Sequence, residues 1–369
     1  MKRKVISLLL AGAMAFSLAA CGGSGSSADS SAAGSDDKIA MITDSGDITD
    51  ESFNQITYET VVAYGDDNGI EYQYYKPADD TDEERINAID LAIAEGATVI
   101  VMPGYLFGPA IAEEQDANPD VKFIAADVTE GDVVPQGESE AVEINDNVYL
   151  CNFDEEQAGY LAGYAAVKDG YTSLGFLGGI AVPAVVRYGY GYIQGINDAA
   201  EELGTDVTVK YTYGGQFYGD EKITAKMEGW YSGGTEVVFA CGGGIYTSAR
   251  DAAGDTGKLI GVDVDQHPTL GDVCITSAMK GLSSAVNSAL DAYFSGNWSE
   301  IGGKAEQLGL EDGDYIGLPT DEESWLFTTF TQDEYNTVLE SIRDGSIEIS
   351  NSTDEQPAVG SHVTVNYID

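Results

Sequence analysis

Short apolar runs alternate with amphipathic segments along most of this 369-residue chain. In residues 82–95, for example, Ile86, Ile89 and Ile93 place an apolar stripe along one face of a helix. Strands that alternate with helices are typical of right-handed βαβ units, which build a parallel sheet with helices on both faces. The first series predicts helices at 52–66, 82–95 and 106–117, and strands at Lys38–Thr43, Ile70–Tyr75, Thr98–Met102 and Val121–Ala126.

A second series of the same kind follows a loop at residues 129–143 that we expect to be exposed. It begins with a strand at Val148–Cys151, and Asn152 is the expected N-cap of a helix over residues 153–167. The small residues of that helix, Gly159 and Gly163 among them, predict close packing against a sheet or against the other lobe. Further helices are expected at 185–202, 221–230, 245–253, 282–294 and 332–344, and strands at 174–178, 207–212, 236–240, 259–262 and 273–277.

Two βα series of comparable size predict an α/β protein with two Rossmann-like lobes, parallel sheets and an interlobe cleft. About 330 residues remain after the export signal described below, too many for one ordinary core. The N-terminal lobe is expected to hold residues 38–149, with about 278–311 returning to it, and the C-terminal lobe 150–277, with about 312–369. The chain would then cross between the lobes near Tyr149, near Ser277 and once more after Phe294.

The first residues have the features of a bacterial export signal. Three basic residues precede an apolar run, and residues 1–20 end in Leu-Ala-Ala directly before Cys21. That ending resembles a lipobox, at which lipoprotein precursors are lipidated on cysteine and cleaved. Residues 22–37 are rich in glycine and serine, which is typical of a flexible tether. The sequence therefore predicts an extracytoplasmic protein held on the cell membrane through a lipid on Cys21.

Charge and composition exclude several classes of function. The formal net charge is −46, and removal of the three basic residues with the signal takes it to −49. Such a chain repels nucleic-acid polymers, so we expect neither DNA nor RNA as a partner. The histidines His267 and His362 lack metal-ligand spacing. Cys151, Cys241 and Cys274 are expected as small buried core residues, with one disulfide among them as the alternative.

Catalytic motifs are missing from the folded part of the chain. Lys258 lacks the glycine spacing and the hydroxyl residue of a P-loop, and no G-x-S-x-G elbow is present. Ser277 and Lys280 match S-x-x-K, but the companion motifs of acylating enzymes are absent. The sequence therefore predicts a binding protein rather than an enzyme, with no cofactor and no metal.

The stretch Ile42–Gln55 is the strongest candidate for a binding site. It follows a strand, opens a helix and carries Asp44, Asp47, Asp50, Phe53 and Asn54. Ligands bind at the carboxyl ends of strands in open α/β sheets. The carboxylates offer acceptors to a polar ligand, and Phe53 offers a ring to cover a flat one. The simpler alternative is a surface loop whose aspartates cap the helix and whose phenylalanine packs beneath it.

Several longer motifs resemble the basic membrane protein family of lipoproteins, whose best-understood members are purine nucleoside receptors. The resemblance runs from Lys38 to at least Lys280. It is carried by T-D-x-G-x-x-x-D-x-S-F-N-Q at Thr43–Gln55, E-E-Q-A-G-Y-L-A-G at Glu155–Gly163, G-F-L-G-G at Gly175–Gly179, P-A-V-V-R-Y at Pro183–Tyr188, I-G-V-D at Ile260–Asp263 and T-S-A-M-K at Thr276–Lys280. It implies a type I periplasmic-binding-protein fold that serves an ABC transporter.

The resemblance also implies how a ligand is held. A nucleoside would lie in the cleft with its base between Phe53 and Phe217, with Tyr218 as the alternative second ring. Base-facing or pocket-shaping residues would be Asp44, Asp50, Asn54 and Asp127, whereas Asp263 and Lys280 would bind the ribose. In the simpler alternatives Phe217 is a core residue, Asp127 caps a turn, and Lys280 pairs with a surface aspartate. The stretch C-G-G-G-I-Y after Ala240 departs from the family and predicts different local contacts.

The implied partners are a nucleoside-like small molecule, most simply a purine nucleoside, and the permease subunits of an ABC transporter. Two rival functions remain open from the sequence. One is a binding protein for a sugar or another small polar metabolite, because sugars also stack on aromatic rings and need carboxylate acceptors. The other is a surface adhesin or signalling lipoprotein that keeps the fold and transports nothing.

Overall fold

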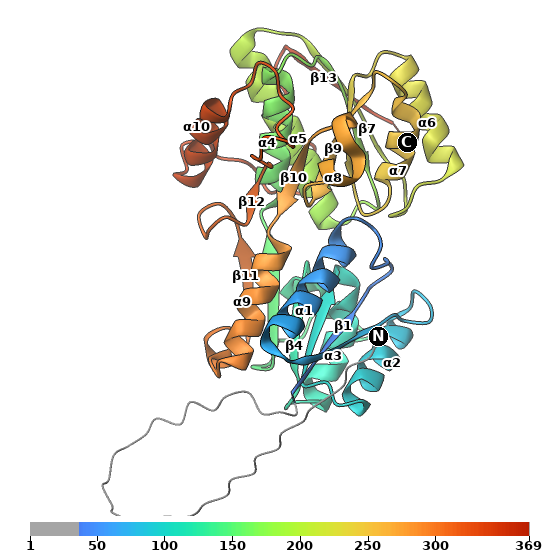
Figure 1. The fold of residues 1–369 in the computed structure, drawn as a ribbon, viewed down its shortest axis with the longest axis vertical. Helices are drawn as coiled ribbons and strands as arrows, with labels where there is room; N and C mark the ends of the chain where they lie inside the picture. Colours follow the sequence, from blue (N-terminus) through green and yellow to red (C-terminus); the bar gives the residue numbers. More distant parts are fainter. Residues whose placement is uncertain (1–36, 369) are drawn as a thin grey trace, which may run out of the picture.

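The computed structural model describes residues 37–368 and shows two α/β lobes, one above the other in Figure 1. The predicted export signal, Cys21 and residues 22–36 of the predicted tether lie outside the described residues. Each lobe is built on one sheet, and all pairings but one are parallel. In the described part of the chain, no helix is both long and apolar enough to cross a membrane. The two-lobed α/β fold that the alternating pattern predicted is therefore confirmed.

The N-terminal lobe contains a six-stranded sheet in the order β11-β5-β4-β3-β1-β2. Alternate residues of β1 face opposite sides, as the two-residue period of a strand requires. Ile39 and Met41 join the core beneath α1 and α9, whereas Ala40 and Ile42 join the core beneath α2 and α3. The elements are β1 (Lys38–Ile42), α1 (Phe53–Asn68), β2 (Glu71–Tyr75), α2 (Asp82–Ala94), β3 (Val99–Pro103), η1 (Tyr105–Phe107), α3 (Gly108–Ala117), β4 (Lys122–Ala126), η2 (Glu130–Asp132), β5 (Val148–Phe153), α9 (Leu282–Phe294), η4 (Trp298–Glu300) and β11 (Lys304–Leu308).

The C-terminal lobe contains a seven-stranded sheet in the order β12-β10-β9-β8-β6-β7-β13. The short strand β12 runs antiparallel to β10. The elements are α4 (Glu155–Lys168), β6 (Ser173–Gly178), α5 (Pro183–Leu203), β7 (Val207–Tyr213), α6 (Glu221–Ser232), β8 (Val237–Cys241), α7 (Tyr246–Ala253), β9 (Lys258–Asp263), α8 (His267–Leu270), η3 (Gly271–Val273), β10 (Cys274–Lys280), β12 (Ile316–Gly317), α10 (Gln332–Arg343) and β13 (Val363–Tyr367).

The chain passes between the two sheets three times, and the first two passages lie a few residues later than expected. It leaves the first sheet after Phe153 rather than near Tyr149, because β5 pairs with both β4 and β11. It leaves the second sheet after Lys280 rather than at Ser277, because β10 continues along β9 and then pairs with β12. The third passage lies between β11 and β12. The short strands β11, β12 and β13 were not predicted.

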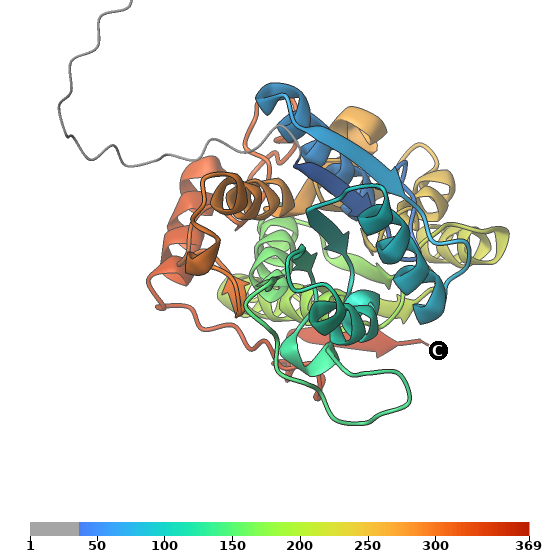
Figure 2. The same cartoon turned by 90° about the horizontal axis from the view of Figure 1, so that it is seen from below.

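The prediction that Asn152 caps a helix is wrong. Asn152 lies within β5, and its side chain donates a hydrogen bond to the carbonyl oxygen of Val128 (2.8 Å). The strand continues for two residues beyond the expected end, and Asp154 takes the N-cap position of α4. The loop between β4 and β5 is mostly exposed, as predicted, and projects from the molecule in green in Figure 2.

Cysteines in the described part of the chain are buried and unbonded. Cys151, Cys241 and Cys274 are at most 1% exposed, and all three are free thiols. This confirms that they are small core residues and contradicts the alternative of a disulfide among them.

Helices α4 and α5 touch backbone to backbone through glycine. A Cβ atom on Gly159 would lie 2.1 Å from the carbonyl oxygen of Tyr188, and one on Gly195 would lie 2.0 Å from that of Tyr160. The close packing predicted from small residues is therefore confirmed, but the principal partner of α4 is helix α5 of the same lobe rather than a sheet or the other lobe. The packing also places Glu155, at the start of α4, against Arg187, at the start of α5.

We predict that Gly159→Ala destabilises the protein by about 1–3 kcal/mol, because overpacking at a rigid contact forces the two backbones apart. Gly229→Ala is the matched control, because Gly229 also lies in a helix but a Cβ there would meet nothing within 4 Å. The control should instead gain about 0.5–1 kcal/mol from the better helix propensity of alanine. Denaturant unfolding of the two variants measures both changes, and equal stability would contradict the proposed contact.

Candidate functional site

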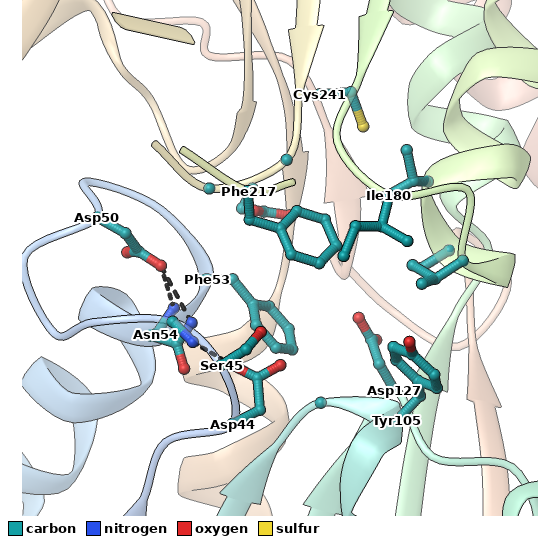
Figure 3. Close-up of a pocket in the computed structure, with 18 of the residues that line it drawn as sticks. Asp44, Ser45, Asp50, Phe53, Asn54, Tyr105, Asp127, Ile180, Phe217 and Cys241 are labelled. Carbon is teal, nitrogen blue, oxygen red and sulfur yellow. Dashed lines mark hydrogen bonds between the residues drawn. The ribbon is translucent and has the colours of Figure 1, made fainter. Parts of the chain in front are cut away.

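A cavity of about 660 Å³ lies between the two lobes, at the carboxyl ends of strands from both sheets. Its volume falls within the roughly 300–1,000 Å³ that is usual for small-molecule sites. Figure 3 shows Asp44, Phe53 and Asp127 entering it from one lobe and Phe217 from the other. All eight residues predicted as ligand-binding line this cavity: Asp44, Asp50, Phe53, Asn54, Asp127, Phe217, Asp263 and Lys280.

Asp50 organises the start of α1. Its carboxylate accepts hydrogen bonds from the backbone N–H groups of Ser52 (2.9 Å), Asn54 (3.1 Å) and Gln55 (3.0 Å). It also accepts from the side-chain amide of Asn54 (3.1 Å). The helix-capping alternative is therefore correct for Asp50 itself. Because a carboxylate can only accept here, it fixes the amide of Asn54, whose Oδ1 is buried and has no partner.

Asp44 forms the floor of the cavity near α1 (Figure 3). Its Oδ1 accepts from the N–H of Gly46 (2.9 Å), and Gly104 leaves the room that its other oxygen occupies. Burial raises the pKa of Asp44 to about 6, and the hydrogen bond from Gly46 and the charge of Arg85 only partly oppose this. Asp44 can therefore gain or lose a proton close to neutral pH.

Phe217 is held against glycine. A Cβ on Gly179 would lie 2.4 Å from its ring, and one on Gly242 would lie 2.9 Å from it. The unusual stretch after Ala240 thus supplies glycine where the ring needs space. Tyr218, the alternative second ring, is 64% exposed, whereas Phe217 enters the cavity (Figure 3). These contacts favour Phe217 as the aromatic wall of the C-terminal lobe.

Four charged side chains, two buried and two partly buried, form a network beside the cavity. Lys280 donates to Asp127 (2.7 Å) and to Glu155 (3.2 Å), and Arg187 donates to the other oxygen of Glu155 (2.6 Å). The side chains of Lys280 and Glu155 are 2% and 0% exposed. Lys280 therefore pairs with Asp127 of the N-terminal lobe and with the buried Glu155, rather than with a surface aspartate. Because its carboxylate accepts from Lys280, Asp127 does not cap a turn.

The network contains two positive and two negative groups, and their charges support one another. Burial opposes the ionisation of Glu155, but the charges of Arg187 and Lys280 hold its pKa below the usual range. Burial likewise opposes the charge of Lys280, yet Asp127 and Glu155 keep its pKa above the usual range. For Asp127, burial outweighs the attraction of Lys280 and raises the pKa.

Asp263 connects the two lobes. Its carboxylate accepts from the hydroxyl of Ser52, at the start of α1 (2.5 Å), and from that of Tyr188 (3.4 Å). Next to it, the side chain of Gln266 donates to the backbone oxygen of Glu51 (2.9 Å), and Thr269 donates to the carboxylate of Glu51 (3.0 Å). The lobes therefore meet where the residues just before α1 contact the end of β9 and the start of α8.

The backbone is strained at three of these positions. Glu51, Asp127 and Asp263 have φ angles of 51°, 59° and 66°, in the left-handed region that non-glycine residues rarely adopt. Asp127 and Asp263 occupy similar places at the carboxyl ends of strands: Asp127 directly follows β4, and Asp263 is the last residue of β9. Such strain persists only where the surroundings hold it, and it gathers at binding sites.

The sequence did not single out Asn152, Arg187 and Tyr188 as residues of the cavity lining. It also did not single out Glu155 of the adjacent ion network. Three of them lie within the motifs Glu155–Gly163 and Pro183–Tyr188, which were noted without roles for single residues. The available signal was the pair Glu155-Glu156 at the start of a helix of mostly small and apolar residues, because a carboxylate that such a helix buries needs a cation. Among the described residues, no cluster of His, Cys, Asp or Glu has a metal-binding arrangement.

Comparison with known proteins identifies the family. The Bmp family, described as ABC transporter substrate-binding protein PnrA-like, matches residues 37–353. The chain belongs to this family. Family membership assigns it to the substrate-binding proteins of ABC transporters, a class of binding proteins rather than enzymes.

Individual relatives agree with this assignment. Basic membrane protein B of Borreliella burgdorferi is 29% identical over 78% of this chain and 82% of its own length. The ABC transporter nucleoside-binding protein BmpA of Lactococcus lactis is 27% identical over 72% of this chain and 75% of its own. A solute-binding protein of Aeropyrum pernix shares the fold of this Bmp-family chain, with a TM-score of 0.67, 20% identity and coverage of 84% and 87% of the two chains.

Glu156 yields a prediction on pH. Glu156 is 3% exposed, and its Oε2 has no hydrogen-bond partner, although Arg187 lies 4.0 Å from it. Burial, followed by the charge of Asp154, raises the pKa of Glu156 to about 8. The folded state therefore keeps a proton that the unfolded chain releases near its usual pKa of 4.5, so stability falls as pH rises from that value through about 8. Glutamine cannot titrate, and Glu156→Gln should lose less stability over this window.

Melting temperatures of the ligand-free protein at pH 5.5, 7 and 8.5 measure this effect. The wild-type protein and the control Glu113→Gln, which changes an exposed carboxylate of α3, should fall together, while Glu156→Gln falls less. Parallel profiles for all three proteins would show that Glu156 does not titrate in this range.

Proposed function

We propose that this protein is a lipid-anchored, extracytoplasmic receptor that binds a nucleoside, most simply a purine nucleoside, and delivers it to an ABC permease. The observation that carries the proposal is the pair of phenylalanines, Phe53 and Phe217, that enter one cavity from opposite lobes (Figure 3). Stacking on each ring contributes about 1–3 kcal/mol and suits any flat base. The L. lactis relative, described as nucleoside-binding, supports the same ligand class.

The polar groups of the cavity favour a ligand that donates hydrogen bonds. Asn54 presents an unpaired oxygen beside Phe53, and Asp127 presents another at the end of β4. Asp50 acts through Asn54 by holding its amide in place. Asp44 adds a carboxylate with a pKa of about 6. Base N–H and amino groups supply such donors.

Ribose binding would fall to the groups on the side of the C-terminal lobe. Asp263 lies at the end of β9 and can accept from sugar hydroxyls in addition to Ser52. Lys280, held by Asp127 and Glu155, would donate to ribose oxygens. Its ammonium lies 4.9 Å from the ring centre of Phe53, so the ribose site and the stacking site adjoin.

Net charge favours nucleosides over nucleotides. The lining of the cavity contains seven aspartates, against Lys76, Arg187 and Lys280 as its cations. A phosphate group would therefore enter a site of net negative charge, where like charges repel. The proposed lipid anchor rests on the L-A-A-C sequence that ends at Cys21.

A thermal-shift screen of the protein without residues 1–36 tests the ligand class. A ligand at about a hundred times its dissociation constant should add roughly 2.7 kcal/mol to the free energy of unfolding. We expect guanosine, inosine or adenosine to stabilise the protein and their phosphates to have little effect. Stabilisation by sugars alone would contradict the nucleoside as ligand and favour a sugar-binding protein of the same fold. No response from any compound would favour an adhesin or signalling role.

Ring variants test the stacking site. Phe53→Ala and Phe217→Ala should each weaken nucleoside binding by at least tenfold, because about 1.4 kcal/mol of lost stacking is a factor of ten. Tyr218→Ala, which changes the exposed neighbouring ring, should bind within twofold of the wild-type protein. Calorimetric titration measures all three affinities. A loss in Tyr218→Ala with none in Phe217→Ala would transfer the role to Tyr218.

A further inference from the structure

Asn152 is a buried cavity residue whose amide orientation is fixed. It is 4% exposed and lies near the carboxyl end of β5, between β11 and β4 of the N-terminal sheet. Its Nδ2 donates to the carbonyl oxygen of Val128 (2.8 Å). Because a carbonyl can only accept, the nitrogen of the amide must lie on that side. The Oδ1 of Asn152 therefore faces away from Val128, where it is buried and has no hydrogen-bond partner.

Asp127 presents a second acceptor of the same kind directly beside it. Strands β4 and β5 are paired with Ala126 opposite Cys151, and the N–H of Asp127 donates to the carbonyl oxygen of Cys151 (2.9 Å). Asp127 and Asn152 therefore lie side by side at the carboxyl ends of two adjacent strands. Lys280 donates to Oδ2 of Asp127, whereas Oδ1 of Asp127 is buried and has no hydrogen-bond partner. Figure 3 shows the carboxylate of Asp127 directed into the cavity.

Two neighbouring acceptors without donors are unusual inside a protein, where buried polar atoms are nearly always hydrogen-bonded. The cations of the network do not satisfy them, since Lys280 and Arg187 are directed to Asp127 Oδ2 and to Glu155. Both residues line the cavity, so a bound molecule can supply the missing donors. A ligand carbonyl placed here would face two oxygens and be repelled, whereas an amino group has two N–H bonds to give.

We infer that Asn152 is a specificity-determining residue, which together with Asp127 selects ligands that carry an amino group on the nucleobase. The inference rests on the proposed function and adds to it the chemical feature that the cavity distinguishes. A site whose buried acceptors need a donor discriminates strongly against an analogue that lacks one, because those acceptors then stay unpaired. A merely structural Asn152 would hold the turn at Val128 and leave ligand preference unchanged.

Two ligand pairs that differ only in an amino group test the inference by calorimetric titration. Guanosine differs from inosine by its 2-amino group, and adenosine differs from purine riboside by its 6-amino group. The wild-type protein should bind the amino-bearing member of at least one pair at least tenfold more tightly. In Asn152→Ala that ratio should shrink to about threefold or less, mainly through weaker binding of the amino-bearing nucleoside.

Asn147→Ala is the matched control for a structural effect. Asn147 is also a 4% exposed asparagine, directly before β5, and its amide donates to the backbone oxygens of Gln115, Asn118 and Val121. It does not line the cavity, so its variant should melt at a lower temperature and keep the ligand ratio of the wild-type protein. Asn152→Ser, which is smaller and still polar, provides a second variant and should also lose the ratio.

Each outcome separates the inference from the function on which it rests. If none of the four nucleosides binds, the proposed function and the inference are both rejected. Tight binding without an amino preference in the wild-type protein rejects the inference alone, and this result needs no variant. A preference that survives in Asn152→Ala and Asn152→Ser likewise overturns it, because another group must then recognise the amine.

Discussion

The placement of the binding cavity depends on one buried ion network. Lys280 is the last residue of β10 before the chain crosses to the N-terminal lobe, and it binds Asp127 of that lobe and Glu155 at the start of α4. Removing one member of a buried ion pair typically costs about 3–5 kcal/mol, because the remaining charge is left unpaired. The network therefore fixes how the strand ends of the two lobes stand relative to each other, and the cavity lies between those strand ends.

The network in turn depends on how closely α4 and α5 pack. Glu155 begins α4 and Arg187 is the fifth residue of α5, so their 2.6 Å contact exists only while the helices remain at backbone contact. Gly159 and Gly163 on one helix, and Gly191 and Gly195 on the other, permit that approach. Glycines that do not themselves line the cavity thus set the position of a carboxylate that holds Lys280 beside it.

The sequence predicted the repeating βα pattern and the two lobes, because hydrophobic periodicity and helix caps are local signals. The predictions from sequence were wrong where a contact between residues far apart in the sequence determines the structure. Asn152 reads as a helix cap, but β5 extends past it because β11, a mostly polar strand about 150 residues later, pairs along its whole length. The resemblance to the family named all eight candidate site residues. It could not show that the carboxylate of Asp50 already accepts four hydrogen bonds from N–H groups, or that Asn152 keeps an oxygen without a hydrogen-bond partner.

In the proposed function, the carboxylate of Asp263 both joins the two lobes and binds the ligand. Asp263 accepts from Ser52 of the opposite lobe, and in the proposed function it also accepts from the ligand. Its pKa is raised by burial, so each added donor makes the buried charge less costly. A ligand hydroxyl at Asp263 and the hydroxyl of Ser52 therefore stabilise the same anion, and both require the lobes to be together. The strained backbone at Glu51 and Asp263 lies at this junction, where contacts from both lobes hold it. In the proposed function, contact between the lobes and recognition of the ligand therefore depend on one set of hydrogen bonds, made by residues that neither lobe can bring together alone.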